Sequence, residues 1–271
     1  MAITPHDIAK MLDHSTLQPF LTEEDIRKGC ELALKYDCAS VCARPCDVPI
    51  LAEMLGGSDV KVCTVIGFPH GSHETAIKVA EAKLALEEGC TELDMVINIG
   101  KMIAGDTEYV KNEIKLLADA AHEKGAILKV ILETCYLTDE QKITCCKLAE
   151  EAGADFVKTS TGYGSKGCTI DDLKLMRASV SSHIRVKGSG GNLLLVGTFN
   201  MTGGTITDSN ATTNGGAVYL SENAAGFTIS GTAKIYGNTC GGEPQDVYMG
   251  KKDLCLTLDS WNSLDWTMAS A

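Results

Sequence analysis

Residues 155–162 read DFVKTSTG, and residues 184–191 read IRVKGSGG. Each run is a short apolar strand that ends in a lysine and passes at once into hydroxyl groups and glycine. Lys158 and Lys187 therefore end two successive strands that follow the same pattern. Because neighbouring ammonium groups repel, one lysine of such a pair can lose its proton, and a neutral amine attacks carbonyl carbon. The pair predicts an enzyme whose nucleophile is a lysine.

Apolar strands and helical patterns alternate along the chain before these two runs. The expected strands cover residues 11–13, 39–43, 60–68, 92–99 and 127–133, and the expected helices cover residues 22–36, 74–88, 107–124 and 138–151. A further helix over residues 169–180 separates the two lysine strands. Strands that alternate with helices specify parallel βαβ units, and such a long series indicates a TIM (β/α)8-type barrel more than an open sheet.

In that type of barrel the active site gathers at the carboxyl ends of the strands. The polar or sulfur-bearing residues assigned to these ends are Asp13, Cys42, Asp94, Glu133, Lys158 and Lys187. Asp94 lies within an apolar strand, where a carboxylate needs partners to stay charged, and lysines on neighbouring strands would supply them. The same residues could instead form an internal ion-pair network that only holds the barrel together. Because all of them fall on one rim, we favour catalysis.

The motifs on these strands resemble those of the deoxyribose-phosphate aldolase family, which are class I aldolases of the barrel type. The matching runs keep the family's order from residue 1 to about residue 191: LDHSTL (12–17), VCARP (41–45), VIGFPHG (65–71), ELDMV (92–96), KVILET (129–134) and the two lysine runs. The resemblance implies reversible Schiff-base cleavage of 2-deoxy-D-ribose 5-phosphate to acetaldehyde and D-glyceraldehyde 3-phosphate. Its partners would be small molecules, namely a phosphorylated sugar and an aldehyde.

The resemblance also assigns catalytic roles to three residues. Lys158 would form the Schiff base, Lys187 would lower the pKa of Lys158, and Asp94 would assist proton transfer through water. An iminium ion is a better electron sink than a carbonyl group, so it stabilises the enamine that forms when the carbon–carbon bond breaks. This chemistry needs no metal and no other cofactor.

Six further positions are candidates for substrate binding: Asp13, Ser15, Cys42, Gly162, Gly190 and Gly191. The first two match the family's first-strand pattern and would orient the substrate or a proton relay. Cys42 also matches a rim position, although a buried structural thiol is an equally good interpretation. The three glycines offer backbone amides that could cradle a phosphate group.

Metal and dinucleotide binding are disfavoured by the remaining motifs. His70 and His73 are spaced like a pair of metal ligands, but the sequence offers no matching third ligand, so we expect no metal site. The fragment at residues 162–164 lacks the third glycine of a dinucleotide fingerprint.

Composition and charge indicate which partners and which cell compartment to expect. The 271 residues carry a formal net charge of −12, which disfavours nucleic acid and anionic membranes as partners. The first residues lack a signal-peptide pattern and no long apolar span follows, so we expect a soluble cytoplasmic protein. We read the twelve cysteines as reduced core thiols, and homo-oligomers stay open.

The composition changes abruptly after Gly191. Residues 192–271 are rich in Gly, Thr and Asn, and they hold two self-similar runs, GTFNMTGGTI (197–206) and GFTISGTAKI (226–235). An offset of about 28 residues between strand-like runs is typical of the coils of a parallel β-helix. The tail resembles repeat segments of bacterial surface proteins. We therefore expect an incomplete class I aldolase barrel over residues 1–191 and a β-helix-like segment over residues 192–271.

The tail stands where the family would have its eighth βα unit. We hypothesise that the apolar residues 193–196, or a later strand, cover the gap that this leaves in the barrel. The alternative interpretation is a non-catalytic chimera, or a surface or binding protein whose function lies in the β-helix tail.

Overall fold

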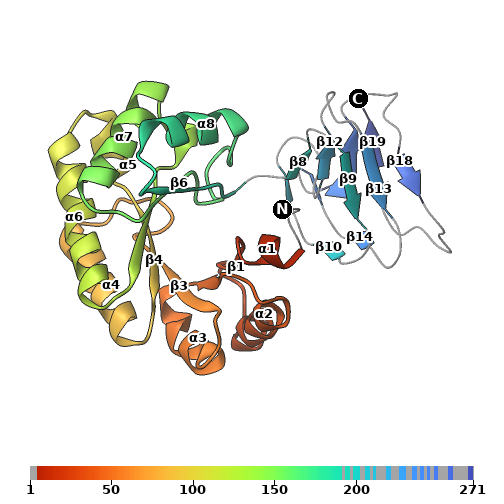
Figure 1. Cartoon of the computed structure of the whole chain (residues 1–271), viewed down its shortest axis with the longest axis horizontal. Helices are drawn as coiled ribbons and strands as arrows, with labels where there is room; N and C mark the ends of the chain where they lie inside the picture. Colours follow the sequence, from red (N-terminus) through yellow and green to blue (C-terminus); the bar gives the residue numbers. More distant parts are fainter. Residues whose placement is uncertain are drawn as a thin grey trace. The chain divides into compact units, whose positions relative to one another are not determined.

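The computed structural model describes residues 5–190 and, beyond them, separate strand segments between residues 193 and 270 (Figure 1). The chain divides into two compact units, residues 1–190 and residues 191–271. Among the described residues, no helix is both long and apolar enough to cross a membrane. The eleven cysteines of the described part are unpaired, and most of them are buried.

A seven-stranded parallel sheet forms the centre of the first unit. Its strands are β1 (Asp13–Thr16), β2 (Ser40–Ala43), β3 (Lys61–Ile66), β4 (Glu92–Val96), β5 (Ile127–Ile131), β6 (Phe156–Lys158) and β7 (Arg185–Lys187). They pair in chain order from β1 to β7, so the expected succession of βαβ units is confirmed. The sheet is curled, because Lys187 at the end of β7 reaches Asp13 on β1, with Nζ 2.8 Å from Oδ2.

Helices surround the outside of this sheet (Figure 1). They are α1 (Pro5–Ala9), α2 (Glu23–Tyr36), α3 (Val48–Leu55), α4 (Thr75–Glu87), α5 (Ile99–Ile103), α6 (Thr107–Glu123), α7 (Asp139–Glu151) and α8 (Ile170–Ser179), with short 3-10 turns at Pro45–Asp47 and Thr134–Tyr136. The five helices expected after residue 20 are present within a residue or two at each end. The sequence analysis missed α1, α3 and α5, which are short and have no amphipathic pattern long enough to be recognised.

Local sequence signals explain where the longer helices begin and end. Thr22 and Asp25 cap α2 reciprocally, since the Thr22 amide donates to Asp25 Oδ2 over 2.8 Å and the Asp25 amide donates to Thr22 Oγ1 over 3.4 Å. Gly125 and Gly153 follow α6 and α7 with φ of 71° and 89°, in the left-handed region that glycine enters without strain.

The expected boundaries of several strands needed correction. The first strand is Asp13–Thr16 and not residues 11–13. β3 and β5 end earlier than expected, because Gly67 and Glu133 have φ of 64° and 55°, which turns the backbone out of the strand.

Side chains alternate between the two faces of the sheet, as the two-residue period of a strand requires. On β4 and β5 the apolar residues Leu93, Met95, Leu128 and Val130 face the helices and are fully buried. Fully burying one such side chain contributes about 1.5–3 kcal/mol to stability. The intervening residues Asp94 and Lys129 face the interior of the curled sheet. The fold thus places polar side chains where the sequence predicted the rim of an active site.

The second unit consists of short strands, which are β8 (Leu193–Leu195), β9 (Thr198–Met201), β10 (Thr205–Thr207), β11 (Asn210–Ala211), β12 (Val218–Leu220), β13 (Gly226–Ile229), β14 (Lys234–Tyr236), β15 (Thr239–Cys240), β16 (Glu243–Pro244), β17 (Val247–Met249), β18 (Leu256–Leu258) and β19 (Met268–Ser270). The two self-similar runs pair with each other in parallel, with Phe199 opposite Phe227 and Ile206 opposite Ile235. That these strands form β-helix coils stays a prediction.

β8 is paired within the second unit. It pairs with β12 in the second unit, with Leu193 opposite Val218. Within the described part of the chain, the first sheet holds only β1 to β7. That residues 193–196 or a later strand cover the gap stays a prediction.

Candidate active site

Lys158 and Asp94 meet in the interior of the curled sheet. Lys158 ends β6, Asp94 lies in β4, and Lys158 Nζ is 2.5 Å from Asp94 Oδ2. Lys158 is 8% exposed and Asp94 is fully buried. The structure thus brings together two of the three residues predicted to be catalytic, and it leaves the lysine head group close to the carboxyl ends of the strands.

Lys187, the third predicted catalytic residue, is paired with Asp13. Its Nζ lies 2.8 Å from Asp13 Oδ2 and donates a hydrogen bond to the Met11 carbonyl over 3.3 Å. Asp13 was predicted as a substrate-binding residue, and in the structure it is also an internal counter-ion. This ion pair joins the first and last strands of the sheet through side chains.

Lys129 connects these two pairs, and the sequence analysis did not single it out. Its Nζ lies 2.9 Å from Asp94 Oδ1, 2.6 Å from Glu92 Oε2 and 3.4 Å from Asp13 Oδ2. A signal for it existed, because Lys129 pairs with Asp94 in the register of β4 and β5 and so faces the same side of the sheet. Glu92, two residues before Asp94, faces that side for the same reason.

The network balances its buried charges and thereby sets the pKa values. Burial alone would raise the pKa of Asp94, but attraction to Lys129 and Lys158 outweighs burial and holds this pKa well below its usual value. Burial likewise lowers the pKa of Lys158, yet attraction to Asp94 outweighs it, so the pKa of Lys158 is raised. In this arrangement the direct ion pair with Asp94 dominates the pKa of Lys158, and the expectation that Lys187 lowers this pKa stays a prediction.

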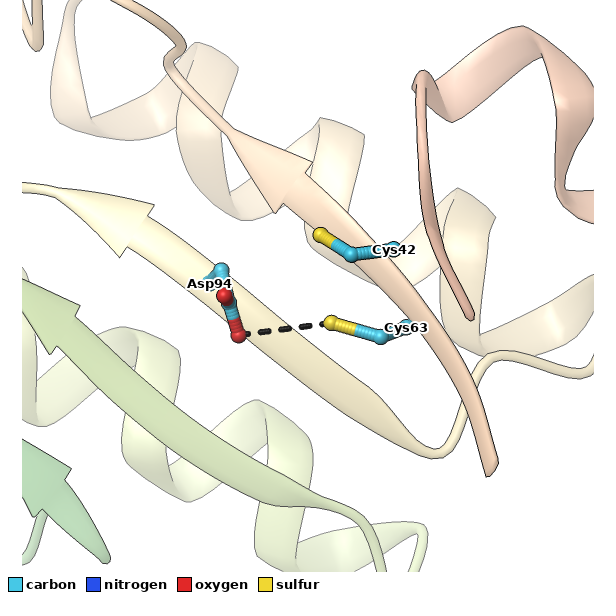
Figure 2. Close-up of side chains that lie close together, drawn as sticks. All are labelled: Cys42, Cys63 and Asp94. Carbon is cyan, nitrogen blue, oxygen red and sulfur yellow. Dashed lines mark hydrogen bonds between the residues drawn. The ribbon is translucent and has the colours of Figure 1, made fainter. Parts of the chain in front are cut away.

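Two buried thiols lie beside Asp94 (Figure 2). Cys63 on β3 donates a hydrogen bond from Sγ to Asp94 Oδ1 over 3.3 Å, and Lys129 Nζ lies 3.4 Å from the same sulfur. Cys42 is opposite Cys63 in the register of β2 and β3. Cys42 was a predicted substrate-binding residue and is 2% exposed, while the sequence analysis did not name Cys63. Burial raises the pKa of the Cys63 thiol well above its usual value.

The loops that follow β5, β6 and β7 pack against one another. Glu133, in its left-handed conformation, accepts hydrogen bonds through Oε2 from the Thr161 hydroxyl and, over 3.2 Å, from the Thr161 amide. This contact fixes the loop that carries Gly162. A Cβ atom added to Gly190 would lie only 3.0 Å from Gly162 Cα, so two of the predicted phosphate-binding glycines are in direct backbone contact. Gly191 lies outside the described residues, and Ser15 is exposed on β1.

A cavity of about 300 Å³ opens at the carboxyl ends of β1 to β3. Its lining residues are Leu17, Pro19, Arg44, Pro45, Val65, Phe68, Pro69, Glu81 and Tyr163. Tyr163, from the loop after β6, donates a hydrogen bond from its hydroxyl group to the Leu17 carbonyl over 3.0 Å, and its ring meets Phe68 edge to face with centroids 5.3 Å apart. Three loops from different strands are thus held together at this mouth.

Comparisons with known proteins agree on one family. Residues 4–211 match the model of the DeoC/LacD family aldolases. The chain is 49% identical to a deoxyribose-phosphate aldolase of Treponema denticola and 54% identical to one of Thermococcus gammatolerans, covering 86% and 83% of those proteins with 68% of its own length. The structure of the Aeropyrum pernix deoxyribose phosphate aldolase, described as tetrameric, matches with a TM-score of 0.62 at 35% identity over 69% of this chain and 79% of that chain.

Proposed function

The chain belongs to the DeoC/LacD aldolase family, and on that premise we propose that it is a class I aldolase that reversibly cleaves 2-deoxy-D-ribose 5-phosphate to acetaldehyde and D-glyceraldehyde 3-phosphate. The observation that carries the proposal is the buried pair of Lys158 and Asp94 in the interior of the sheet. A lysine in this place can form an imine while the surrounding protein excludes competing water.

Lys158 must lose a proton before it attacks the substrate aldehyde. Asp94 Oδ2, at 2.5 Å from Nζ, accepts a hydrogen bond from the ammonium group and is positioned to guide that proton to water, and Lys129 on the other carboxylate oxygen keeps Asp94 oriented. The amine then adds to C1 of the open-chain sugar, and loss of water gives the iminium ion. When the C3 hydroxyl group loses its proton, the C2–C3 bond breaks and D-glyceraldehyde 3-phosphate leaves. The electron pair of that bond passes into the iminium ion, which becomes an enamine. Protonation of the enamine at C2 and hydrolysis release acetaldehyde and restore Lys158.

Phosphate recognition would rest on the contact between the loops that carry Gly162 and Gly190. Both glycines have positive φ, 88° and 68°, a conformation that occurs in the backbone nests that bind anions. We infer that Glu133 supports this cradle by holding Thr161 beside it. Lys187 and Asp13 would place the substrate hydroxyl groups, in keeping with their position at the seam between β7 and β1.

We infer further that the first unit is a (β/α)8-type barrel without its eighth βα unit. The seven parallel strands, the ion pair that links β7 to β1 and the unmatched remainder of each relative support this. For the tail we propose β-helix coils, supported by the parallel pairing of its self-similar runs. A non-catalytic surface or binding protein is not favoured, because such a role would not require the buried lysine network.

The proposal is tested by measuring acetaldehyde release from 2-deoxyribose 5-phosphate in a coupled alcohol dehydrogenase assay. We expect activity in the full chain, a loss of at least about a thousandfold in Lys158→Ala, and no change in Lys166→Ala, which removes an exposed lysine of the loop after β6. Equal activity of Lys158→Ala and the full chain would contradict the assigned nucleophile.

A further inference from the structure

Three side chains of types that can ligate metals lie close together in the interior, on adjacent strands. Cys42 comes from β2, Cys63 from β3 and Asp94 from β4, and Figure 2 shows the three side chains lying close together. Their two sulfur atoms and one carboxylate oxygen lie within 4.8 Å of one another, and all three residues are buried. Among the described residues, these three side chains thus form a ready group of ligand atoms on a rigid sheet.

The donor set suits a thiophilic divalent cation. Zinc binds thiolate at about 2.3 Å and carboxylate oxygen at about 2.0–2.2 Å, so neighbouring donors around a tetrahedral ion lie about 3.5–3.8 Å apart. The separations in the structure, at most 4.8 Å, exceed that spacing by about 1 Å, so the side chains close in when the ion binds. Three protein ligands also leave a fourth position for water, as in zinc sites that are not purely structural.

We infer that Cys42, Cys63 and Asp94 form a binding site for a thiophilic divalent cation such as zinc or cadmium. The site is inhibitory, because the bound ion takes Asp94 away from Lys158. The inhibition rests on the proposed aldolase function, whereas the binding itself does not.

Charge balance favours this site despite the nearby lysines. The network already matches its ammonium groups with carboxylates, which are Lys129, Lys158 and Lys187 with Asp13, Glu92 and Asp94. A divalent cation that displaces the protons of two thiols leaves the net charge of the network unchanged. Lys129 Nζ, 3.4 Å from Cys63 Sγ, then donates to a thiolate, which stabilises the ligand from outside the coordination shell.

The two thiols lie next to side chains of the cavity wall. Cys42, Cys63 and Val65 form one apolar cluster, against which Leu17 and Phe68 pack. Leu17, Val65 and Phe68 also line the 300 Å³ cavity, so the cavity and the two thiols share one layer of packed side chains. Binding competes with thiol protonation, and the affinity for the cation therefore rises with pH.

The experiment is a titration of the reduced full chain with cadmium chloride, followed by the ultraviolet charge-transfer absorbance of cadmium thiolate. We expect one cadmium per chain and a band that is lost in Cys63→Ala and in Cys63→Ser, the second of which keeps a hydrogen-bond donor to Asp94. Cys145→Ala is the matched control, because this thiol is equally buried but lies on α7. The control keeps the full band.

A second readout uses zinc chloride against acetaldehyde release. Zinc inhibits the full chain and Cys145→Ala, a chelator restores activity, and Cys63→Ser raises the half-inhibitory zinc concentration by at least about tenfold. A cadmium band that persists in both Cys63 variants, or that never forms at one equivalent, would overturn the site. A chain with no aldolase activity but with the Cys63-dependent band would refute the proposed function and leave the metal site standing.

Discussion

Replacement of Asp94 by asparagine removes the charge on which the internal network is centred. In the structure its two carboxylate oxygens lie 2.5 Å from Lys158 Nζ and 2.9 Å from Lys129 Nζ. With an effective dielectric constant of about 20, each attraction amounts to about 6 kcal/mol before desolvation is subtracted. The asparagine amide oxygen can still accept a hydrogen bond from one lysine, but its amide nitrogen would face the other ammonium group.

The net cost of Asp94→Asn follows from this balance. The desolvation penalty of the carboxylate disappears, and Lys129 keeps Glu92 and Asp13 as partners, whereas Lys158 is left buried with a neutral neighbour. Removing one partner from a buried ion pair typically costs about 3–5 kcal/mol, and we expect a loss of unfolding free energy in that range.

The assay is urea unfolding followed by far-ultraviolet circular dichroism at neutral pH. Asp171→Asn is the control, because it makes the same change in a side chain that is 97% exposed. The contact of Asp171 with its lysine partner is long, at 3.9 Å. We expect no measurable change in this control. If Asp94→Asn were as stable as Asp171→Asn, the network would not hold the buried charges as described.

Three further expectations concern other parts of the molecule. Glu113→Gln should destabilise the fold by about 3–5 kcal/mol in urea unfolding, because the fully buried Lys78, 2.8 Å away, loses its counter-ion. The double change Lys78→Met with Glu113→Leu should recover most of the lost stability. If it recovered none, the unpaired Lys78 charge would not be the cause of the loss. Burial would raise the pKa of Asp13, but attraction to Lys129 and Lys187 outweighs burial and lowers this pKa. The ionised Asp13 therefore stabilises the folded state above the unfolded pKa of about 4, and this stabilisation is lost as the pH falls below it. Asp13→Asn should therefore flatten the decline of unfolding free energy between about pH 5 and pH 3, and an unchanged slope would refute the assignment. The Michaelis constant for 2-deoxyribose 5-phosphate should exceed that of the Treponema denticola relative, because part of that relative's length has no match here; equal constants would show that the missing part is not needed for binding.

Period and motif were sufficient to predict much of the fold. The lysine runs placed β6 and β7 correctly, and Thr22 with Asp25 marked the start of α2. The end of β5 could not be predicted, because Glu133 adopts a left-handed conformation that is rare outside glycine and depends on its contacts with the loop after β6. Short elements such as α5 carry too few residues for a period to show.

The sequence predicted which residues form the candidate site, but it did not predict which of them form ion pairs. Sequence spacing put Lys158, Lys187 and Asp94 on one rim, and the structure brings the first and third of them together. It also pairs Lys187 with Asp13, and the ion pair with Asp94 raises the pKa of Lys158. The sign of that pKa depends on a distance of 2.5 Å between two side chains, and no sequence pattern contains such a distance.

The measurement that tests the central claim most directly is peptide mass mapping after treatment of the folded full chain with acetaldehyde and borohydride. Reduction of an imine leaves a stable ethyl group on the nitrogen that formed it. The account predicts a single dominant ethyl group on Lys158, with Lys129 and Lys187 unmodified. A dominant adduct on another lysine, or none on chain that circular dichroism shows to be folded, would contradict it.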